Sequence, residues 1–109
     1  MIDLSIVIVS FNTREMLKDC LHSLESVRSN SIEVFVVDNA SKDGSADMVR
    51  ETFPWVDFIE NSQNLGFAPA NNQAILKSKG RYVMLLNSDT IMLPETPGSI
   101  LSFMDENKS

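Results

Sequence analysis

Two aspartates follow apolar runs, and their positions give them a possible joint role in binding. Asp38 comes directly after residues 34–37, and Asp89 closes the run 82–89. Runs of this kind, rich in Val, Leu and aromatic residues, are typical of strands buried on both faces of a parallel sheet. Ligands of open α/β sheets bind beyond the carboxyl ends of the strands. We therefore expect both carboxylates at one ligand-binding edge of a sheet.

The chemistry open to these acids depends on what surrounds them. Asp38 could accept hydrogen bonds from a nucleobase or ribose, or from the amides of its own loop in an Asx-turn. The triplet Asn87, Ser88 and Asp89 offers amide and carboxylate oxygens, which are hard ligands that suit Mg²⁺ or Mn²⁺. The same triplet could instead form an ordinary turn. Residue types alone leave these alternatives open.

A third polar candidate lies within an apolar helix pattern. Asn71 shares a predicted helix face with Phe67, Ala74 and Ile75. An unpaired amide on such a face would cost roughly 1–3 kcal/mol, so it must find a partner in the loop backbone or in a ligand. The start of this helix could also face an anion.

Alternating strand and helix patterns position these residues. Asn12, with Glu15 three residues later, has the spacing of a capping box for the first helix. The order βαβαβαβ and then a helix, with right-handed crossovers, predicts an α/β fold with half of a doubly wound, mainly parallel sheet. The expected strands cover residues 4–9, 33–37, 55–60 and 81–86, and the expected helices cover residues 14–28, 46–52 and 66–80, with a last helix from residue 96.

Composition narrows the class of protein. A chain of 109 residues is sized for a single domain, residues 1–109. A net charge of −6 without a Lys/Arg cluster argues against nucleic acid as a partner, and it implies that a bound diphosphate would need a cation beside it. The lone Cys20 fits a reducing compartment. With no apolar stretch near ~18 residues and no basic leader, we expect the cytoplasm or the cytoplasmic face of a membrane.

Four motifs carry a resemblance when they are taken in order. They are Ile6-Val7-Ile8-Val9-Ser10-Phe11-Asn12, Val36-Val37-Asp38-Asn39-Ala40-Ser41-Lys42-Asp43-Gly44-Ser45, Asn64-Leu65-Gly66-Phe67 with Asn72, and Leu85-Leu86-Asn87-Ser88-Asp89-Thr90. Together they resemble the inverting glycosyltransferases of family 2, whose domain has the GT-A fold. The resemblance implies that the chain is the N-terminal, nucleotide-sugar-binding half of that fold. The Asn-Leu-Gly-Phe and Asn-Ser-Asp motifs look most like the rhamnosyltransferase-like branch.

The resemblance implies roles in binding a UDP- or dTDP-sugar donor. Phe11 would lie near the base, Asp38 would hydrogen-bond that base, and Asp89 would hold a divalent metal, Mg²⁺ or Mn²⁺, on the diphosphate. The wall around ribose and phosphate would be shaped by Asn64, Gly66 and Asn72. The remaining residues that it places at the donor are Ser10, Asn12, Asn39, Asn87 and Ser88.

The chain departs from the family pattern at three positions and in length. Asn87 stands where the metal motif usually has its first acid, Ala74 where glycine is frequent, and Asn71 where many members have arginine. Family members are considerably longer, so we expect the catalytic base beyond Ser109 and assign no catalytic residue here. The full-length enzyme would transfer the sugar with inversion to a saccharide or lipid-linked saccharide acceptor, as in cell-surface polysaccharide biosynthesis.

Two other functions fit the same elements. A nucleotidyltransferase also uses a doubly wound sheet with metal-binding acids, but residues 10–14 lack the glycine-rich phosphate loop that such enzymes favour. A non-catalytic binding or assembly module of the same fold is the other alternative. The last strand would have an open apolar edge in a half-sheet, so we also expect self-association through that edge.

Overall fold

The computed structural model describes residues 1–107, in which four strands and four helices alternate strictly along the chain. The elements are β1 (Leu4–Ser10), α1 (Arg14–Glu25), β2 (Ile32–Asp38), α2 (Ser45–Thr52), β3 (Asp57–Glu60), α3 (Phe67–Lys77), β4 (Tyr82–Asn87) and α4 (Thr96–Asn107). No helix within these residues is long and apolar enough to cross a bilayer.

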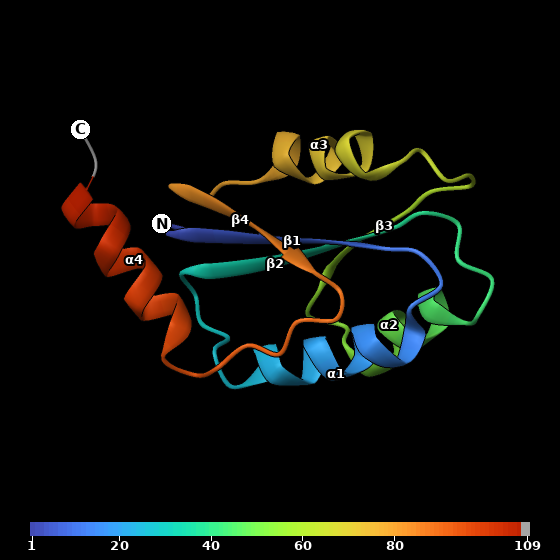
Figure 1. Ribbon diagram of the computed structural model, residues 1–109, viewed down its shortest axis with the longest axis horizontal. Coiled ribbons are helices and arrows are strands. Elements are labelled where there is room, and N and C mark those ends of the chain that lie inside the picture. Colours follow the sequence, from blue (N-terminus) through green and yellow to red (C-terminus); the bar gives the residue numbers. More distant parts are fainter. Residues whose placement is uncertain (108–109) are drawn as a thin grey trace.

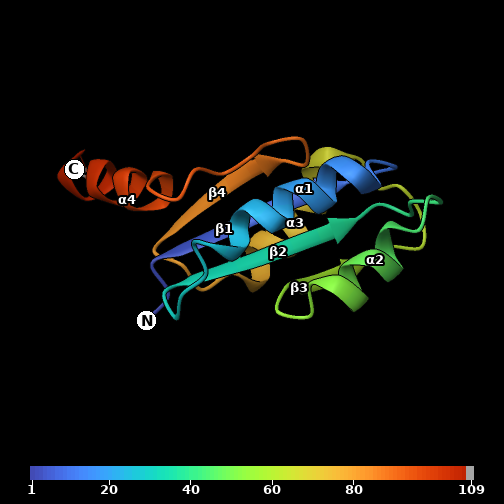
Figure 2. The ribbon, with the colours of Figure 1, turned by 90° about the horizontal axis from the view of Figure 1, so that it is seen from below.

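The strands form one parallel sheet in the order β3-β2-β1-β4. Helix α3 covers one face, whereas α1 and α2 cover the other (Figures 1 and 2). Because β1 pairs with both β2 and β4, the sheet grows in two directions from β1, and the crevice at this switch is where open α/β sheets bind ligands. The predicted α/β class and doubly wound parallel sheet are confirmed.

The core has two layers, one on each side of the sheet. On the side of α1 and α2, leucines of α1 such as Leu17 and Leu21 pack with Ile6, Ile8 and Val36. Burying a side chain of this size stabilises the fold by roughly 1.5–3 kcal/mol. The layer on the side of α3 is smaller and consists of Val7, Phe35, Val37, Ala70 and Ala74.

Helix α1 begins at Arg14 as predicted, but its C-terminal end and its N-cap differ from the prediction. It stops at Glu25 rather than at residue 28, because the chain turns there and the Val27 N–H donates to the Leu24 carbonyl. The expected cap by Asn12 is wrong. Thr13 occupies the N-cap position, while Asn12 has a φ of +52° and its Oδ1 accepts a hydrogen bond from the backbone N of Lys42.

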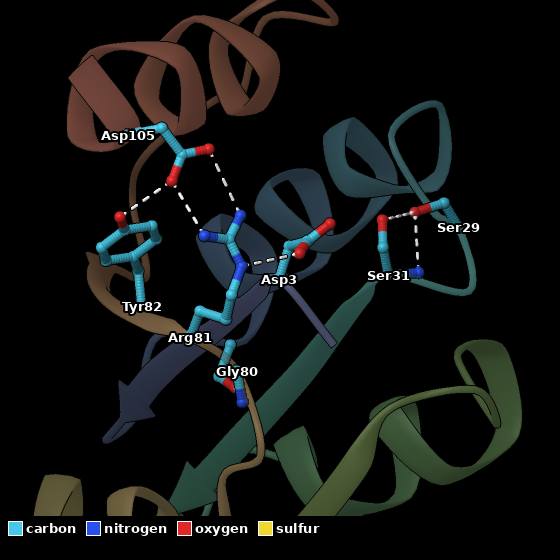
Figure 3. A network of polar contacts seen from close by, with 8 residues as sticks. Asp3, Ser29, Ser31, Gly80, Arg81, Tyr82 and Asp105 are labelled. Atoms are coloured by element: carbon cyan, nitrogen blue, oxygen red, sulfur yellow. Dashed lines mark hydrogen bonds and ion pairs between the residues drawn. The ribbon is translucent and has the colours of Figure 1, made fainter. Parts of the chain in front are cut away.

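A polar network fastens α4 to the amino-terminal edge of the sheet. Arg81 donates from Nε to Asp3 at 2.9 Å and from Nη1 to Asp105 of α4 at 2.8 Å (Figure 3). The Tyr82 hydroxyl donates to the same Asp105 carboxylate at 2.9 Å. This anchorage lies at the edge opposite the carboxyl ends of the strands, so it leaves that second edge free for a site.

Gly80 occupies a position that tolerates no side chain. Its N–H donates to Ser5 Oγ at 2.9 Å. A Cβ at Gly80 would lie 2.5 Å from Ser5 Oγ and 2.6 Å from the backbone N of Ser5. This close approach lets the chain enter β4 directly beside β1.

We expect Gly80→Ala to lower the free energy of unfolding by about 1–3 kcal/mol, because the added methyl forces β1 and the start of β4 apart. Urea denaturation followed by circular dichroism measures this change. Gly98→Ala is the matched control, since nothing lies within 4 Å of its Cβ and alanine favours the helix. Equal denaturation midpoints for Gly80→Ala and the wild type would contradict the steric explanation.

Candidate functional site

A cleft of about 460 Å³ opens at the carboxyl edge of the sheet. The ends of β1, β2 and β4 and the start of α3 supply its walls. Its lining residues are Val9, Phe11, Thr13, Asn39, Asn64, Gly66, Phe67, Asn87, Ser88 and Asp89. The cleft therefore lies at the switch between β1 and its two neighbours, where the fold is expected to bind a ligand.

A second hollow, of about 560 Å³, lies near the amino ends of β2 and β3. On its wall, the Arg28 guanidinium lies 4.6 Å from the centre of the Trp55 ring. Although this hollow is larger, none of the predicted site residues lines it. We therefore place the candidate site at the carboxyl edge.

The end of β4 brings three residues with oxygen-bearing side chains to the cleft. After Asn87 the chain makes a turn in which the Thr90 N–H donates to the Asn87 carbonyl at 3.1 Å. This turn places Asn87, Ser88 and the exposed Asp89 on the cleft wall. Thr13 Oγ1 donates to Ser88 Oγ at 3.0 Å, so the start of α1 supports the same turn.

Asp38 lies at this edge but is not among the residues that line the cleft. It is 1% exposed, and its two oxygens accept hydrogen bonds from the backbone N and the hydroxyl of Ser41, at 2.9 and 2.6 Å. This is the turn that the sequence left as an alternative. The structure therefore does not bring Asp38 and Asp89 together on one wall, and a contact between Asp38 and a base stays a prediction.

The loops after β1 and β2 are held together by side-chain hydrogen bonds. The backbone N of Asn12 donates to Ser41 Oγ at 2.8 Å, and Asn12 and Ala40 both adopt left-handed backbone conformations, with φ of +52° and +66°. Such conformations are strained in residues other than glycine and persist only where surrounding contacts enforce them. The hydrogen bonds between these two loops hold the neighbouring Phe11, which is 47% exposed, at the cleft.

Ser10 and Asn12, both predicted at the donor, do not line the cleft. Ser10 is buried, and its hydroxyl lies 3.1 Å from Thr13 Oγ1, whose other contact is Ser88. Both residues thus support the loops rather than the cleft wall. Thr13 also lines the cleft, although the sequence analysis did not select it; the available signal was a hydroxyl residue in the loop between β1 and α1.

The start of α3 forms the opposite wall. Gly66 has a φ of +87°, which glycine adopts without strain, and its N–H donates to Asn64 Oδ1 at 2.8 Å. Asn72 is exposed on α3 and is not a lining residue. Asn71 is 3% exposed and donates from Nδ2 to the Phe67 carbonyl, while its Oδ1 has no hydrogen-bond partner among residues 1–107.

Asp89 also influences the interior beneath the cleft. Burial raises the pKa of the Cys20 thiol to about 11, and the negative charge of Asp89 adds to this effect. Cys20 is thus a neutral thiol at physiological pH, and it packs in the α1 core rather than acting as a nucleophile.

The cleft residues fit a metal ion that is shared with an anionic ligand. Within residues 1–107, no group of three or more His, Cys, Asp or Glu side chains is placed to hold a metal alone. Asp89, with the oxygens of Asn87 and Ser88 beside it on the wall, supplies one carboxylate and neutral oxygen donors. Mg²⁺ commonly binds through one or two carboxylates together with substrate phosphates and water, and this donor set is compatible with such an ion.

Similar proteins of known sequence are glycosyltransferases. The chain is 32% identical over 104 residues to an uncharacterized glycosyltransferase of Haemophilus influenzae. The alignment covers 95% of this chain and 35% of that protein. The chain is also 30% identical over 106 residues to the putative teichuronic acid biosynthesis glycosyltransferase TuaG of Bacillus subtilis, with 94% of this chain and 42% of that one covered. The chain thus spans well under half the length of these relatives.

Solved structures share the fold. S. aureus TarS in complex with UDP-GlcNAc matches with a TM-score of 0.85 and 24% identity, over 96% of this chain and 32% of that one. The mannosyltransferase PcManGT from Pyrobaculum calidifontis, in complex with GDP-Man and Mn²⁺, matches with a TM-score of 0.86 and 24% identity, over 93% of this chain and 32% of that one. The architecture is that of GT-A glycosyltransferases.

The family assignment itself comes from the sequence. The model of the family described as "Glycosyl transferase family 2" matches residues 5–109, which is nearly the whole chain. Together with the parallel sheet and the cleft at its switch point, this match establishes that the chain belongs to glycosyl transferase family 2.

Proposed function

We propose that this chain is the donor-binding part of a glycosyltransferase and that its cleft binds the nucleoside diphosphate of a sugar donor. The observation that carries the proposal is the pairing, in one cleft, of an exposed aromatic residue, Phe11, with the oxygen donors that end in Asp89. The structures of TarS with UDP-GlcNAc and of PcManGT with GDP-Man and Mn²⁺ support it, because both have this fold.

The two ends of the cleft suit different parts of such a donor. The Phe11 ring offers an apolar face on which a nucleobase can stack. Asn87, Ser88 and Asp89 would hold Mg²⁺ or Mn²⁺, which when bound stabilises the negative charge of a departing diphosphate. The wall of Asn64 and Gly66 would then face the ribose and phosphates.

Charge makes the metal necessary for tight binding. The whole chain carries a net charge of −6, and none of the described residues that line the cleft is Lys or Arg. A diphosphate would therefore meet a negative protein with no cationic side chain at the wall. A divalent cation beside Asp89 removes this repulsion.

Transfer would need groups that this cleft does not contain. Among the lining residues of the described chain, Asp89 is the single carboxylate, and the proposed metal occupies it. We infer that residues outside this part of the protein supply the base that activates a saccharide or lipid-linked saccharide acceptor. Single displacement would then invert the anomeric carbon, and the chain alone would bind donor without transferring sugar.

We also propose a class of donor and a cellular location for the enzyme. The Asn64–Phe67 sequence and the Asn-Ser-Asp triplet favour a rhamnosyltransferase-like enzyme, with a dTDP-sugar such as dTDP-rhamnose as the donor and a UDP-sugar as the alternative. Such an enzyme would work in the cytoplasm, or at the cytoplasmic face of a membrane, in the synthesis of a cell-surface polysaccharide.

We expect isothermal titration calorimetry to detect weak binding of UDP or dTDP that strengthens when Mn²⁺ is added, because the cation offsets the charge repulsion in the cleft. Titration with EDTA present measures the metal-free affinity. Failure of both nucleotides to bind with Mn²⁺, together with the lack of any thermal shift, would favour the non-catalytic module. Efficient sugar transfer by this chain alone would contradict the inference that residues outside it supply the catalytic base.

Asp89→Asn should weaken Mn²⁺-dependent nucleotide binding by at least about tenfold, because it removes the charged metal ligand while preserving shape. The metal-free affinity should change little or improve. Glu51→Gln is the matched control: it changes the net charge equally from an exposed position on α2. Equal Mn²⁺ dependence in Asp89→Asn and the wild type would contradict the metal assignment.

The open edge of β4 is proposed to mediate self-association. β4 pairs with β1 on one side, where the Tyr82 N–H donates to the Asp3 carbonyl. The backbone N–H and C=O groups of successive residues in a strand point to alternate sides, so those of Val83 and Leu85 face the open edge. The side chains of Val83 and Leu85 are 40% and 49% exposed. A long apolar edge of this kind is a template for pairing with another chain.

We expect the wild type to self-associate at high concentration in multi-angle light scattering, and Leu85→Lys to shift it towards the monomer because a charge disfavours edge pairing. Leu76→Lys serves as the control, since Leu76 is 87% exposed on α3. A wild type that remains monomeric at the highest concentrations would disprove association through this edge.

A further inference from the structure

We propose that Gln73 is a positioning residue for the cleft, which it shapes through Asn61 and Asn39; its significance for donor binding rests on the function proposed above. Gln73 lies on α3 and does not line the cleft. Three amide side chains are hydrogen-bonded in series: Gln73 at the outer end, Asn61 in the middle and Asn39 at the inner end. Asn39 is buried and lines the cleft.

Asn39 is the inner end of this chain, and its amide connects β2 to the wall before α3. The residue is 2% exposed. Its Nδ2 donates to the Gly66 carbonyl at 3.1 Å, and its Oδ1 accepts from the backbone N of Leu65 at 3.4 Å. One side chain therefore holds the backbone of two consecutive residues, Leu65 and Gly66, at the position where Gly66 borders the cleft.

Asn61 and Gln73 determine how the Asn39 amide is oriented. Asn61 Nδ2 donates to Asn39 Oδ1 at 3.0 Å and to Gln73 Oε1 at 2.8 Å. In return, Gln73 Nε2 donates to Asn61 Oδ1 at 2.8 Å. The reciprocal pair uses one hydrogen of Asn61 Nδ2 and fixes the orientation of the Asn61 amide, so the second hydrogen is directed at Asn39 Oδ1. Asn39 Nδ2 then faces Gly66.

The loop depends on this network because it has little other support. Residues 61–66 link β3 to α3 without helix or strand (Figure 1), and residues 62–66 are exposed. Asn61 N–H bonds to the Asp38 carbonyl at 2.9 Å at one end of the loop, and Gly66 N–H bonds to Asn64 Oδ1 at the other. Between these two points, the Asn39 amide is the contact from the sheet that holds the loop backbone.

Gln73 can be changed without removing the packing of its helix. α3 is held on the sheet by Ala70 and Ala74, which are fully buried, whereas Gln73 is only partly buried. A substitution at Gln73 therefore separates an effect on the cleft wall from a loss of the fold. Gln73→Met retains the length and helix preference of the side chain but removes both hydrogen bonds to Asn61.

The test compares Gln73→Met with the matched control Gln63→Met, which removes an exposed amide from the same loop. Three quantities are measured on the full chain: amide hydrogen exchange of Leu65 by NMR, affinity for UDP with Mn²⁺ by calorimetry, and the melting temperature. We expect Gln73→Met to exchange faster at Leu65 and to bind UDP roughly fivefold more weakly. Its melting temperature should stay close to that of the control.

The double variant Asn61→Ala/Gln73→Met tests whether both residues act through their pair. The double variant should bind UDP no more weakly than Asn61→Ala alone, because the first substitution already removes what Gln73 contacts. Additive losses would show that Gln73 acts by another route and would overturn the proposal.

The remaining outcomes also decide the proposal. Unchanged Leu65 exchange in Gln73→Met would overturn it, as would faster exchange with unchanged UDP affinity, or an equal loss of affinity in Gln63→Met. If the wild type binds no nucleotide, the proposed function fails and the donor-related role of Gln73 fails with it. The Leu65 exchange rate then still shows independently whether Gln73 holds the loop.

Discussion

The parallel register of β1 with its two neighbours is the constraint on which the cleft depends. Ser10 lies opposite Asp38 of β2, and Val9 lies opposite Asn87 of β4. Because the three strands run in one direction and end level with one another, the loops that follow them leave from the same edge. A shift of one residue in this register would move the Asn87–Asp89 turn and reverse the faces of β4.

The two edges of the sheet serve different purposes. At the amino-terminal edge, Arg81 binds both Asp3 and Asp105 and thereby holds α4 against the amino-terminal ends of β1 and β4 (Figure 3). At the carboxyl edge, neutral side chains connect the loops: Thr13 contacts Ser88, and Asn39 contacts Gly66. Neutral donors and acceptors stabilise these loops without placing a fixed positive charge in the cleft.

The absence of cationic residues from the described cleft wall gives the site its chemical character. Asp89 is exposed there, and its negative charge adds to the effect of burial in raising the pKa of the Cys20 thiol. Under the proposed function, a divalent cation would offset this negative charge when an anionic ligand binds. The proposed nucleoside diphosphate would be such a ligand, and the membership in glycosyl transferase family 2 supports that proposal.

The sequence by itself determined the alternation of strands and helices, the parallel sheet and the edge at which the polar residues gather, since these follow from local periodicity and from the handedness of crossovers. Tertiary structure alone decided which polar atoms face the cleft. Asp38 turns to Ser41, Asn12 bonds to Lys42 instead of capping α1, and Asn39 reaches Gly66. Hydrogen bonds of the last two kinds join residues 27 to 30 positions apart, so they form only when the packed sheet has brought the loops together, and no local pattern specifies them.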